Sequence, residues 1–272
     1  MRPLSCAATS TYTGDVALIE FENVRKAFGR KVVYESLNLS IHEGEAITII
    51  GGSGMGKSVM LKMLIGLMPI DDGQIRFDGE VISNLPEKDL TSVRARIGML
   101  FQGAALFDSL SVRENIAYPL REHGSPKEKE IDERVAECLE DVGLPGIEKM
   151  IPASLSSGMR KRVATARAIA LRPEVILYDE PTTGLDPIAK GHITDLIVEL
   201  NNRYEVTTVV VTHDMPSALR VSDRLAMIDR GYIIFEGTPD DVRHAEDPRV
   251  RDFIEGNAPE EDDIQTLLRY GG

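Results

Sequence analysis

The feature that most constrains the fold is a glycine-rich segment that fits the pattern G-x-x-x-x-G-K-[ST]. The continuous apolar run Ala46–Ile50 precedes it and is typical of a strand covered on both faces, and residues 59–67 follow with helical spacing. Glycines let several backbone N–H groups converge on one phosphate, and the helix N-terminus adds positive potential. The sequence therefore predicts a strand–loop–helix unit that binds phosphate, made of Gly51, Gly52, Ser53, Gly54, Met55, Gly56, Lys57, Ser58 and the first residue after them, Val59.

A second segment supplies acidic groups that suit the chemistry of such a loop. The apolar residues 175–178 predict another buried strand, and Asp179 and Glu180 follow directly at its end. Lys57 is expected to reach the β- and γ-phosphates of a nucleotide, and Ser58 and Asp179 to hold Mg²⁺. Glu180 is placed to orient or deprotonate the attacking water. Together the two segments predict a phosphate-loop enzyme that hydrolyses nucleotides.

The rest of the chain predicts an α/β fold with a mostly parallel sheet, because buried strands alternate with helices. Residues 74–82 and 224–236 read as hairpins, the first turned at Asp78-Gly79. Residues 104–170 are mostly helical and are expected to form an inserted subdomain, in which residues 128–142 make an amphipathic helix that ends at Gly143. We expect a flexible N-terminus at 1–15, one nucleotide-binding domain at 16–245, and a C-terminal extension at 246–272 with an acidic run at 260–263.

Composition narrows the possible partners. Acidic residues outnumber basic residues 44 to 31, giving a net charge of −13, so a globally cationic surface for nucleic acid is excluded. No stretch approaches the roughly 20 apolar residues of a membrane-spanning helix, so we expect the chain not to cross a membrane by itself. The two cysteines, Cys6 and Cys138, are too few for a disulfide framework and indicate the cytoplasm, with Cys138 as a small packing residue.

Further motifs, in their order along the chain, resemble those of the ATP-binding cassette family, and the resemblance covers nearly the whole sequence. The segment from Leu155 to Met159 resembles the family's signature motif, and basic residues follow it on a helix. Single positions that resemble other family elements are Phe28 (the aromatic ring against adenine), Gln102 (the coupling glutamine), Asp186 (the loop that crosses the dimer interface) and His213 (the switch histidine). The resemblance implies a phosphate-loop (RecA-like) core with an antiparallel β subdomain and the inserted helical subdomain.

The resemblance also implies how ATP and Mg²⁺ bind. In the family, the signature motif faces the nucleotide of the opposite subunit, so a chain with one cassette is expected to form a homodimer that sandwiches two ATP molecules. One chain is then expected to supply the catalytic residues of each site, Lys57, Gln102, Glu180 and His213. The same chain is expected to supply the metal ligands Ser58, Gln102 and Asp179. The other chain is expected to contribute Ser156 and Gly158, and Ser157, Met159 and Asp186 are further residues expected to bind the nucleotide.

Two positions depart from the common signature. Ser157 stands where glycine is usual, and Met159 where glutamine is usual. The methionine resembles the cassettes of MCE-type (Mla-like) lipid transporters, as do the stretches 100–107, 118–123, 181–188 and 247–251. This resemblance implies a separate integral membrane permease, a periplasmic MCE-domain lipid-binding protein, a small regulatory subunit, and peripheral location on the cytoplasmic face of the inner membrane.

Three alternatives remain at this point. A cassette for another substrate, such as an amino acid importer, would have identical ATP chemistry, and Met159 argues against it by resemblance alone. A cassette ATPase of DNA repair would carry a long coiled coil between the phosphate loop and the signature, a translation cassette would carry two copies, and the acidic charge disfavours nucleic acid. A phosphate-loop kinase would not need His213 or the signature.

Overall fold

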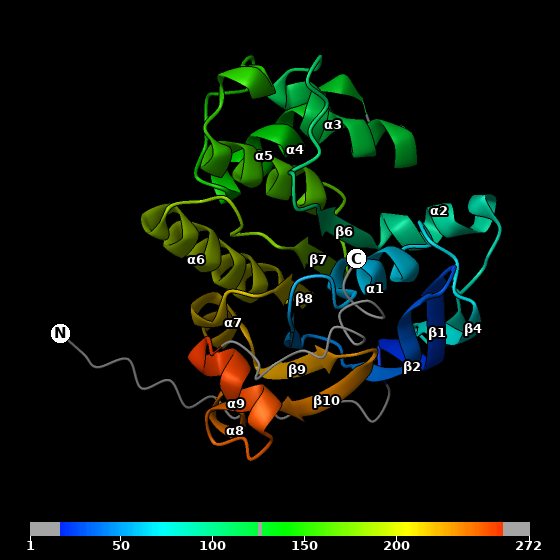
Figure 1. Ribbon diagram of the computed structural model, residues 1–272. Helices are drawn as coiled ribbons and strands as arrows, with labels where there is room; N and C mark the ends of the chain where they lie inside the picture. The colour runs from blue at the N-terminus through cyan, green and yellow to red at the C-terminus, as the bar shows by residue number, and fades with distance from the viewer. Residues whose placement is uncertain (1–16, 125–126, 258–272) are drawn as a thin grey trace.

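The computed structural model describes residues 17–124 and 127–257, and a six-stranded sheet lies at its centre (Figure 1). The strand order is β10-β9-β3-β8-β7-β6, in which the strands from β9 to β6 are parallel and β10 pairs antiparallel with β9. This arrangement confirms the mostly parallel sheet that the sequence predicts. Its strands are β3 (Ala46–Ile50), β6 (Ile97–Leu100), β7 (Val175–Asp179), β8 (Thr207–Thr212), β9 (Arg224–Asp229) and β10 (Tyr232–Gly237).

The middle of this sheet is covered on both faces, which is why its strands are apolar without alternation. Every residue of β3, β7 and β8 is buried. Because these strands are parallel and adjacent, their carboxyl ends meet at one edge of the sheet. The segments that begin at Gly51, Glu180 and His213 leave the sheet at this edge, so the topology alone brings the predicted site together.

A second sheet is antiparallel and four-stranded, in the order β2-β1-β4-β5. Its strands are β1 (Ile19–Phe28), β2 (Lys31–Ile41), β4 (Asp72–Phe77) and β5 (Glu80–Val81). The tight connection from β1 to β2 follows Phe28, and the predicted hairpin at Asp78-Gly79 is confirmed between β4 and β5. One large apolar cluster joins this sheet to the underside of β3 and to helix α1 (Lys57–Leu64).

The predicted helical region lies at the top of Figure 1, in green. A second apolar cluster, which includes Cys138, fixes this region to the other face of the central sheet. Cys138 is buried, as expected of a packing residue, and burial raises the pKa of its thiol to about 12. The helices here are α3 (Val112–His123), α4 (Glu128–Asp141), a 3₁₀ turn η1 (Pro152–Ser154) and α5 (Ser157–Ile169).

The remaining helices flank the central sheet. They are α2 (Glu87–Ala95), α6 (Pro187–Tyr204), α7 (Met215–Val221), α8 (Pro239–Arg243) and α9 (Pro248–Glu255). Val250 of α9 is completely buried and joins an apolar cluster with residues of β9 and α7, so α9 packs directly on the cassette. The N-terminus predicted at 1–15 and the acidic run at 260–263 lie outside the described residues. Within the described ranges, no helix combines the length and the apolar character needed to span a membrane.

Candidate functional site

Two glycines of the phosphate loop, Gly51 and Gly56, occupy positions where other residues do not fit. Gly56 has φ +94°, and a Cβ there would lie 2.5 Å from Cγ1 of Val33. Gly51 has φ +153°, and a Cβ there would lie 2.6 Å from the carbonyl oxygen of Ile228. The buried Tyr34 donates a hydrogen bond of 2.9 Å from its hydroxyl to the Gly56 carbonyl, which fixes the turn into α1. The loop is therefore held in a shape that requires glycine where β2 and β9 approach it.

Lys57 is the first residue of α1, and its ammonium group lies inside the loop. The Nζ atom donates to the carbonyl oxygens of Gly51 at 2.8 Å and Gly52 at 3.0 Å. Burial lowers the pKa of Lys57, and the carboxylates of Glu180 and Asp179 oppose this shift. The nearest charge partner is Glu180, whose Oε1 lies 3.7 Å from Nζ. An ammonium group held this way is positioned for a phosphate that enters the loop.

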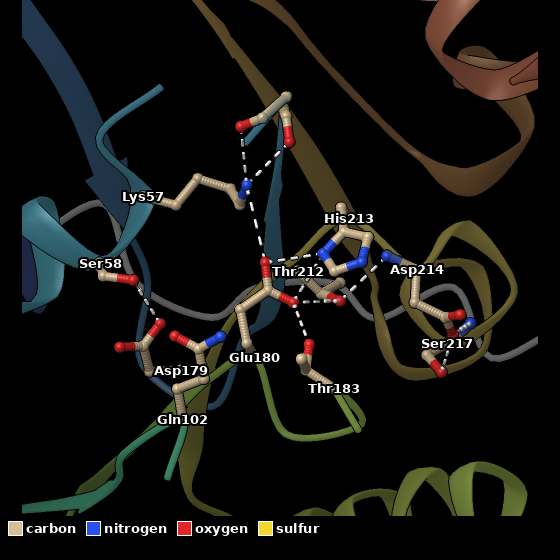
Figure 2. A network of polar contacts seen from close by, with 12 residues as sticks. Lys57, Ser58, Gln102, Asp179, Glu180, Thr183, Thr212, His213, Asp214 and Ser217 are labelled. Atoms are coloured by element: carbon tan, nitrogen blue, oxygen red, sulfur yellow. Dashed lines mark hydrogen bonds and ion pairs between the residues drawn. The ribbon is translucent and has the colours of Figure 1, made fainter. Parts of the chain in front are cut away.

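Ser58 and Asp179 meet as the sequence predicts. The Ser58 hydroxyl donates to Oδ1 of Asp179 over 2.6 Å, and burial raises the pKa of that carboxyl group while the Ser58 hydrogen bond opposes the shift. Figure 2 places the Gln102 side chain beside Asp179. A hydroxyl, a carboxylate and an amide oxygen are ligands that suit Mg²⁺. A nearby cation would also stabilise the charged form of the Asp179 carboxyl group, which burial disfavours. The described part of the chain holds no cluster of three His, Cys, Asp or Glu side chains arranged for a metal, so phosphate and water oxygens would complete the coordination.

Glu180 lies at the centre of the polar network in Figure 2, between the phosphate loop and His213. Its carboxylate is 2.9 Å from Nδ1 of His213 and accepts a 3.0 Å hydrogen bond from the Thr183 hydroxyl. Its backbone has φ +48°, the left-handed region that non-glycine residues rarely adopt. The Glu180 amide donates to the Val211 carbonyl at 2.9 Å, which helps to hold this conformation. The strained turn directs the carboxylate toward the space above the loop.

A pocket of about 850 Å³ opens over these groups. It is lined by the phosphate loop, by Gln102, Glu180 and His213, and by the half-exposed ring of Phe28 at its edge. The ammonium group of Lys26 lies 5.3 Å from the centre of the Phe28 ring. The structure thus brings the phosphate-binding, acidic and aromatic groups into one cavity of nucleotide size.

Sequence reasoning did not identify every residue that lines this pocket. Phe253, Gly256 and Asn257, at the end of α9, line it together with Lys31 and Val33 of β2. Helical spacing with Asp247-Pro248 at the start was the available signal for α9, because Asp caps a helix and Pro suits its first turn. Nothing in that pattern shows that the helix ends beside a pocket whose phosphate loop lies about 200 residues earlier in the sequence.

The signature residues and Asp186 are not among the residues that line this pocket. Ser156 caps helix α5, and its hydroxyl accepts a 3.2 Å hydrogen bond from the Met159 amide. Ser157 is exposed in the first turn, where its hydroxyl accepts from Arg160 at 3.1 Å, and Met159 packs against the apolar cluster beneath the helical region. Asp186 caps α6 by accepting from two backbone amides, that of Ala189 and that of Ile188, and these bonds lower the pKa of its carboxyl group. One chain therefore presents two separate parts of the predicted site.

Comparison with known proteins identifies the family. The ABC transporter family matches residues 34–183, from β2 past the acidic pair. This chain belongs to the ABC transporter family. Its predicted fold class is confirmed, and the chain is an ATPase of that family.

Three curated relatives are similar to this chain over most of its length. The intermembrane phospholipid transport system ATP-binding protein MlaF of Haemophilus influenzae is 42% identical over 241 residues, which are 89% of this chain and 91% of that protein. MlaF of Escherichia coli K12 is 40% identical over the same share of this chain and 90% of its own length. The probable ribonucleotide transport ATP-binding protein mkl of Mycobacterium leprae is 41% identical over 88% of this chain but only 69% of that protein.

Solved structures agree with this assignment. A dimeric structure of the ATP-binding cassette MJ0796 in a post-hydrolysis state, bound to ADP and Pi, has a TM-score of 0.75 and 34% identity, covering 81% of this chain and 98% of that one. The cbiO1 structure from Clostridium perfringens, part of the ABC transporter complex cbiONQ, has a TM-score of 0.77 and 29% identity, covering 85% of this chain and 92% of that one.

Proposed function

We propose that the chain is the ATPase subunit of a phospholipid transporter of the MCE/Mla type. The similarity to MlaF carries this proposal, because it extends over 89% of this chain and 91% of that protein, so the two sequences correspond over most of their lengths. The similarity to mkl stops at 69% of that protein and therefore supports a ribonucleotide substrate less well. The two MlaF proteins thus favour a phospholipid transporter over an amino acid importer and over an ATPase of DNA repair or translation.

The geometry supports a specific division of roles in ATP hydrolysis. Lys57 and the loop amides bind the β- and γ-phosphates, and the Phe28 ring stacks on the base at the edge of the pocket. Ser58, Asp179 and Gln102 hold Mg²⁺, which neutralises charge on the phosphate oxygens when bound. Glu180 accepts a proton from the attacking water, and His213, 2.9 Å away, holds the carboxylate in position and contacts the γ-phosphate.

The separation of the signature from the pocket supports a site shared by two chains. Ser156 and Gly158 lie at the N-terminus of α5, where exposed amides and the helix dipole favour an anion, but they do not line the pocket among the described residues of their own chain. We therefore propose that they close on the ATP of a second copy, with Ser157, Met159 and Asp186 beside them. In a two-fold symmetric pair of chains, the same contact between phosphate loop and signature occurs twice and completes both ATP sites.

A groove of about 360 Å³ supports the proposed contact with the membrane permease. It runs between the end of α1 and helix α3, and the exposed rings of Phe107 and Tyr118 contact each other on its wall, with centroids 5.0 Å apart. Exposed aromatic side chains beside a groove are typical of a protein contact. Because Phe101 of the same groove precedes Gln102, a partner bound here would act directly next to the ATP site. On this basis we propose that the subunit acts on the cytoplasmic face of the inner membrane, with an MCE-domain protein and a small regulatory subunit as further partners.

The test is purification of the tagged chain from membranes in detergent, followed by identification of the proteins and lipids that accompany it. We expect a permease and phospholipid with the wild type, and loss of both for F107D, because a charge in the groove is costly to desolvate. Y232D is the matched control, since Tyr232 is equally exposed but lies on β10. Recovery of DNA or ribosomes without a membrane protein would contradict the proposal, and ribonucleotide in place of lipid would favour the mkl-like function.

A further inference from the structure

The most informative polar group outside the proposed roles is the ammonium group of Lys161. Lys161 lies in the second turn of α5, and only 5% of its surface is exposed. It is not among the residues that line the nucleotide pocket, and its position near the start of a helix gives no sign of a function. A buried ammonium group is costly to desolvate, so its hydrogen-bond partners indicate what it stabilises.

Two backbone carbonyls accept hydrogen bonds from Lys161. One belongs to Gln102 and the other, at 3.2 Å, to Glu180. Burial lowers the pKa of Lys161, and the nearby carboxylates of Asp179 and Glu180 oppose that shift. A single side chain from α5 is therefore bound to the two segments that carry the proposed coupling glutamine and the proposed general base.

These two segments need an external support. Gln102 and Glu180 follow the ends of the neighbouring strands β6 and β7, which are paired from Ile97–Val175 to Leu100–Tyr178 and no further. Glu180 has the left-handed φ of +48°. A conformation of this kind is unfavourable for a non-glycine residue, and it persists where surrounding contacts enforce it. The hydrogen bond from Lys161 acts on the carbonyl of the strained residue itself.

We propose that Lys161 is a positioning residue: it binds the carbonyls of Gln102 and Glu180 and so fixes both side chains relative to the phosphate loop. This inference rests on the roles proposed above for those two residues. Without the ammonium group, the two strand ends lose their common partner, and the Glu180 carboxylate loses its alignment with the attacking water. A displacement of about 1 Å at such a group reduces the rate of the chemical step much more than substrate binding.

The test compares Lys161→Met with the wild-type full chain. Methionine keeps the length and apolar stem of lysine but donates no hydrogen bond. We expect kcat for ATP hydrolysis to fall at least about tenfold, with KM for ATP within about twofold of wild type. Amide hydrogen exchange is also expected to become faster at Ala104 and Thr183, whose amides bond to the Phe101 and Glu180 carbonyls, and this measurement does not depend on turnover.

Thr165→Val is the matched control, because Thr165 is buried one turn further along α5 and its hydroxyl bonds back to the Lys161 carbonyl. It should lower stability without changing kcat or exchange at Ala104 and Thr183. Lys161→Arg retains donors and should recover part of the activity, and Lys161→Leu, which also lacks a donor, gives the second measurement if Lys161→Met does not fold. Wild-type kcat and wild-type exchange in a folded Lys161→Met or Lys161→Leu protein, or equal losses in Thr165→Val, would overturn the inference. Faster exchange with unchanged kcat would confirm that Lys161 holds the two segments and would instead refute the role proposed for Glu180.

Discussion

At the residue scale, the site depends on groups whose charge is set by a few neighbours. The Glu180 carboxylate contacts Lys57, His213 and Thr183, and the Lys57 ammonium also binds loop carbonyls. Burial lowers the pKa of Lys57, and the carboxylates of Glu180 and Asp179 oppose that shift. In the proposed division of roles, Lys57 binds the phosphates and Glu180 accepts the proton, so binding and hydrolysis can be changed separately.

Glu180→Gln should therefore abolish hydrolysis but leave ATP binding intact. An amide cannot accept the proton of the attacking water, so we expect kcat to fall by about 10²- to 10⁴-fold. Equilibrium binding of labelled ATP, measured beside steady-state hydrolysis, separates the two effects. Glu199→Gln, an exposed change on α6, is the control and should retain full activity. Hydrolysis by Glu180→Gln at the wild-type rate would show that another group is the base.

At the element scale, the sequence predicts those elements whose conformation depends on neighbouring residues, and not the contacts between residues far apart in the chain. The phosphate loop and the strands Ala46–Ile50 and Val175–Asp179 are local patterns, with a run of glycines or apolar residues that indicates one conformation. β6 (Ile97–Leu100) was missed, because four residues without flanking turn signals carry no periodicity. The contacts of Lys161 and Phe253 depend on which helix packs where, so no local pattern indicates them.

Helix α3 shows how one side chain organises a neighbouring loop. Asn115 is completely buried, and its amide oxygen accepts from the Phe107 amide at 2.8 Å. Its amide nitrogen donates to the carbonyls of Phe107, Leu110 and Ser111 at 3.0–3.2 Å. The segment that carries Phe107 into the proposed permease groove is thus held by one asparagine.

Asn115→Ala should loosen this segment and destabilise the protein. It leaves buried backbone groups without partners, at a cost of about 1–3 kcal/mol in the free energy of unfolding, which urea titration measures. We also expect weaker recovery of the permease, since Phe107 is no longer held in place. Asn202→Ala, an exposed change on α6, should alter neither. An unchanged urea midpoint for Asn115→Ala would contradict this account of the loop.

At the scale of the whole molecule, the signature residues do not line the pocket of their own chain, and the proposed pair of chains would bring them to it. Disulfide cross-linking between introduced cysteines tests this proposal directly, because the natural cysteines of the chain are not expected to form competing cross-links. Cys138 is buried with its pKa raised to about 12, so it holds almost no reactive thiolate at neutral pH. Cys6 is replaced by serine in every variant used in this cross-linking experiment.

Two chains with one added cysteine each, Ser53→Cys in the phosphate loop and Ser157→Cys in the signature, are prepared in the Glu180→Gln background, which is expected to retain ATP. If ATP holds the loop of one chain against the signature of the other, oxidation should cross-link the mixture of the two proteins more efficiently than either alone, and only with ATP present. Asn202→Cys in place of Ser157→Cys is the control and should give no cross-link, because Asn202 is exposed on α6, away from the signature. The yield is measured by non-reducing electrophoresis. Equal cross-linking without nucleotide, or equal yield from the Asn202→Cys chain, would mean that the two surfaces do not enclose ATP.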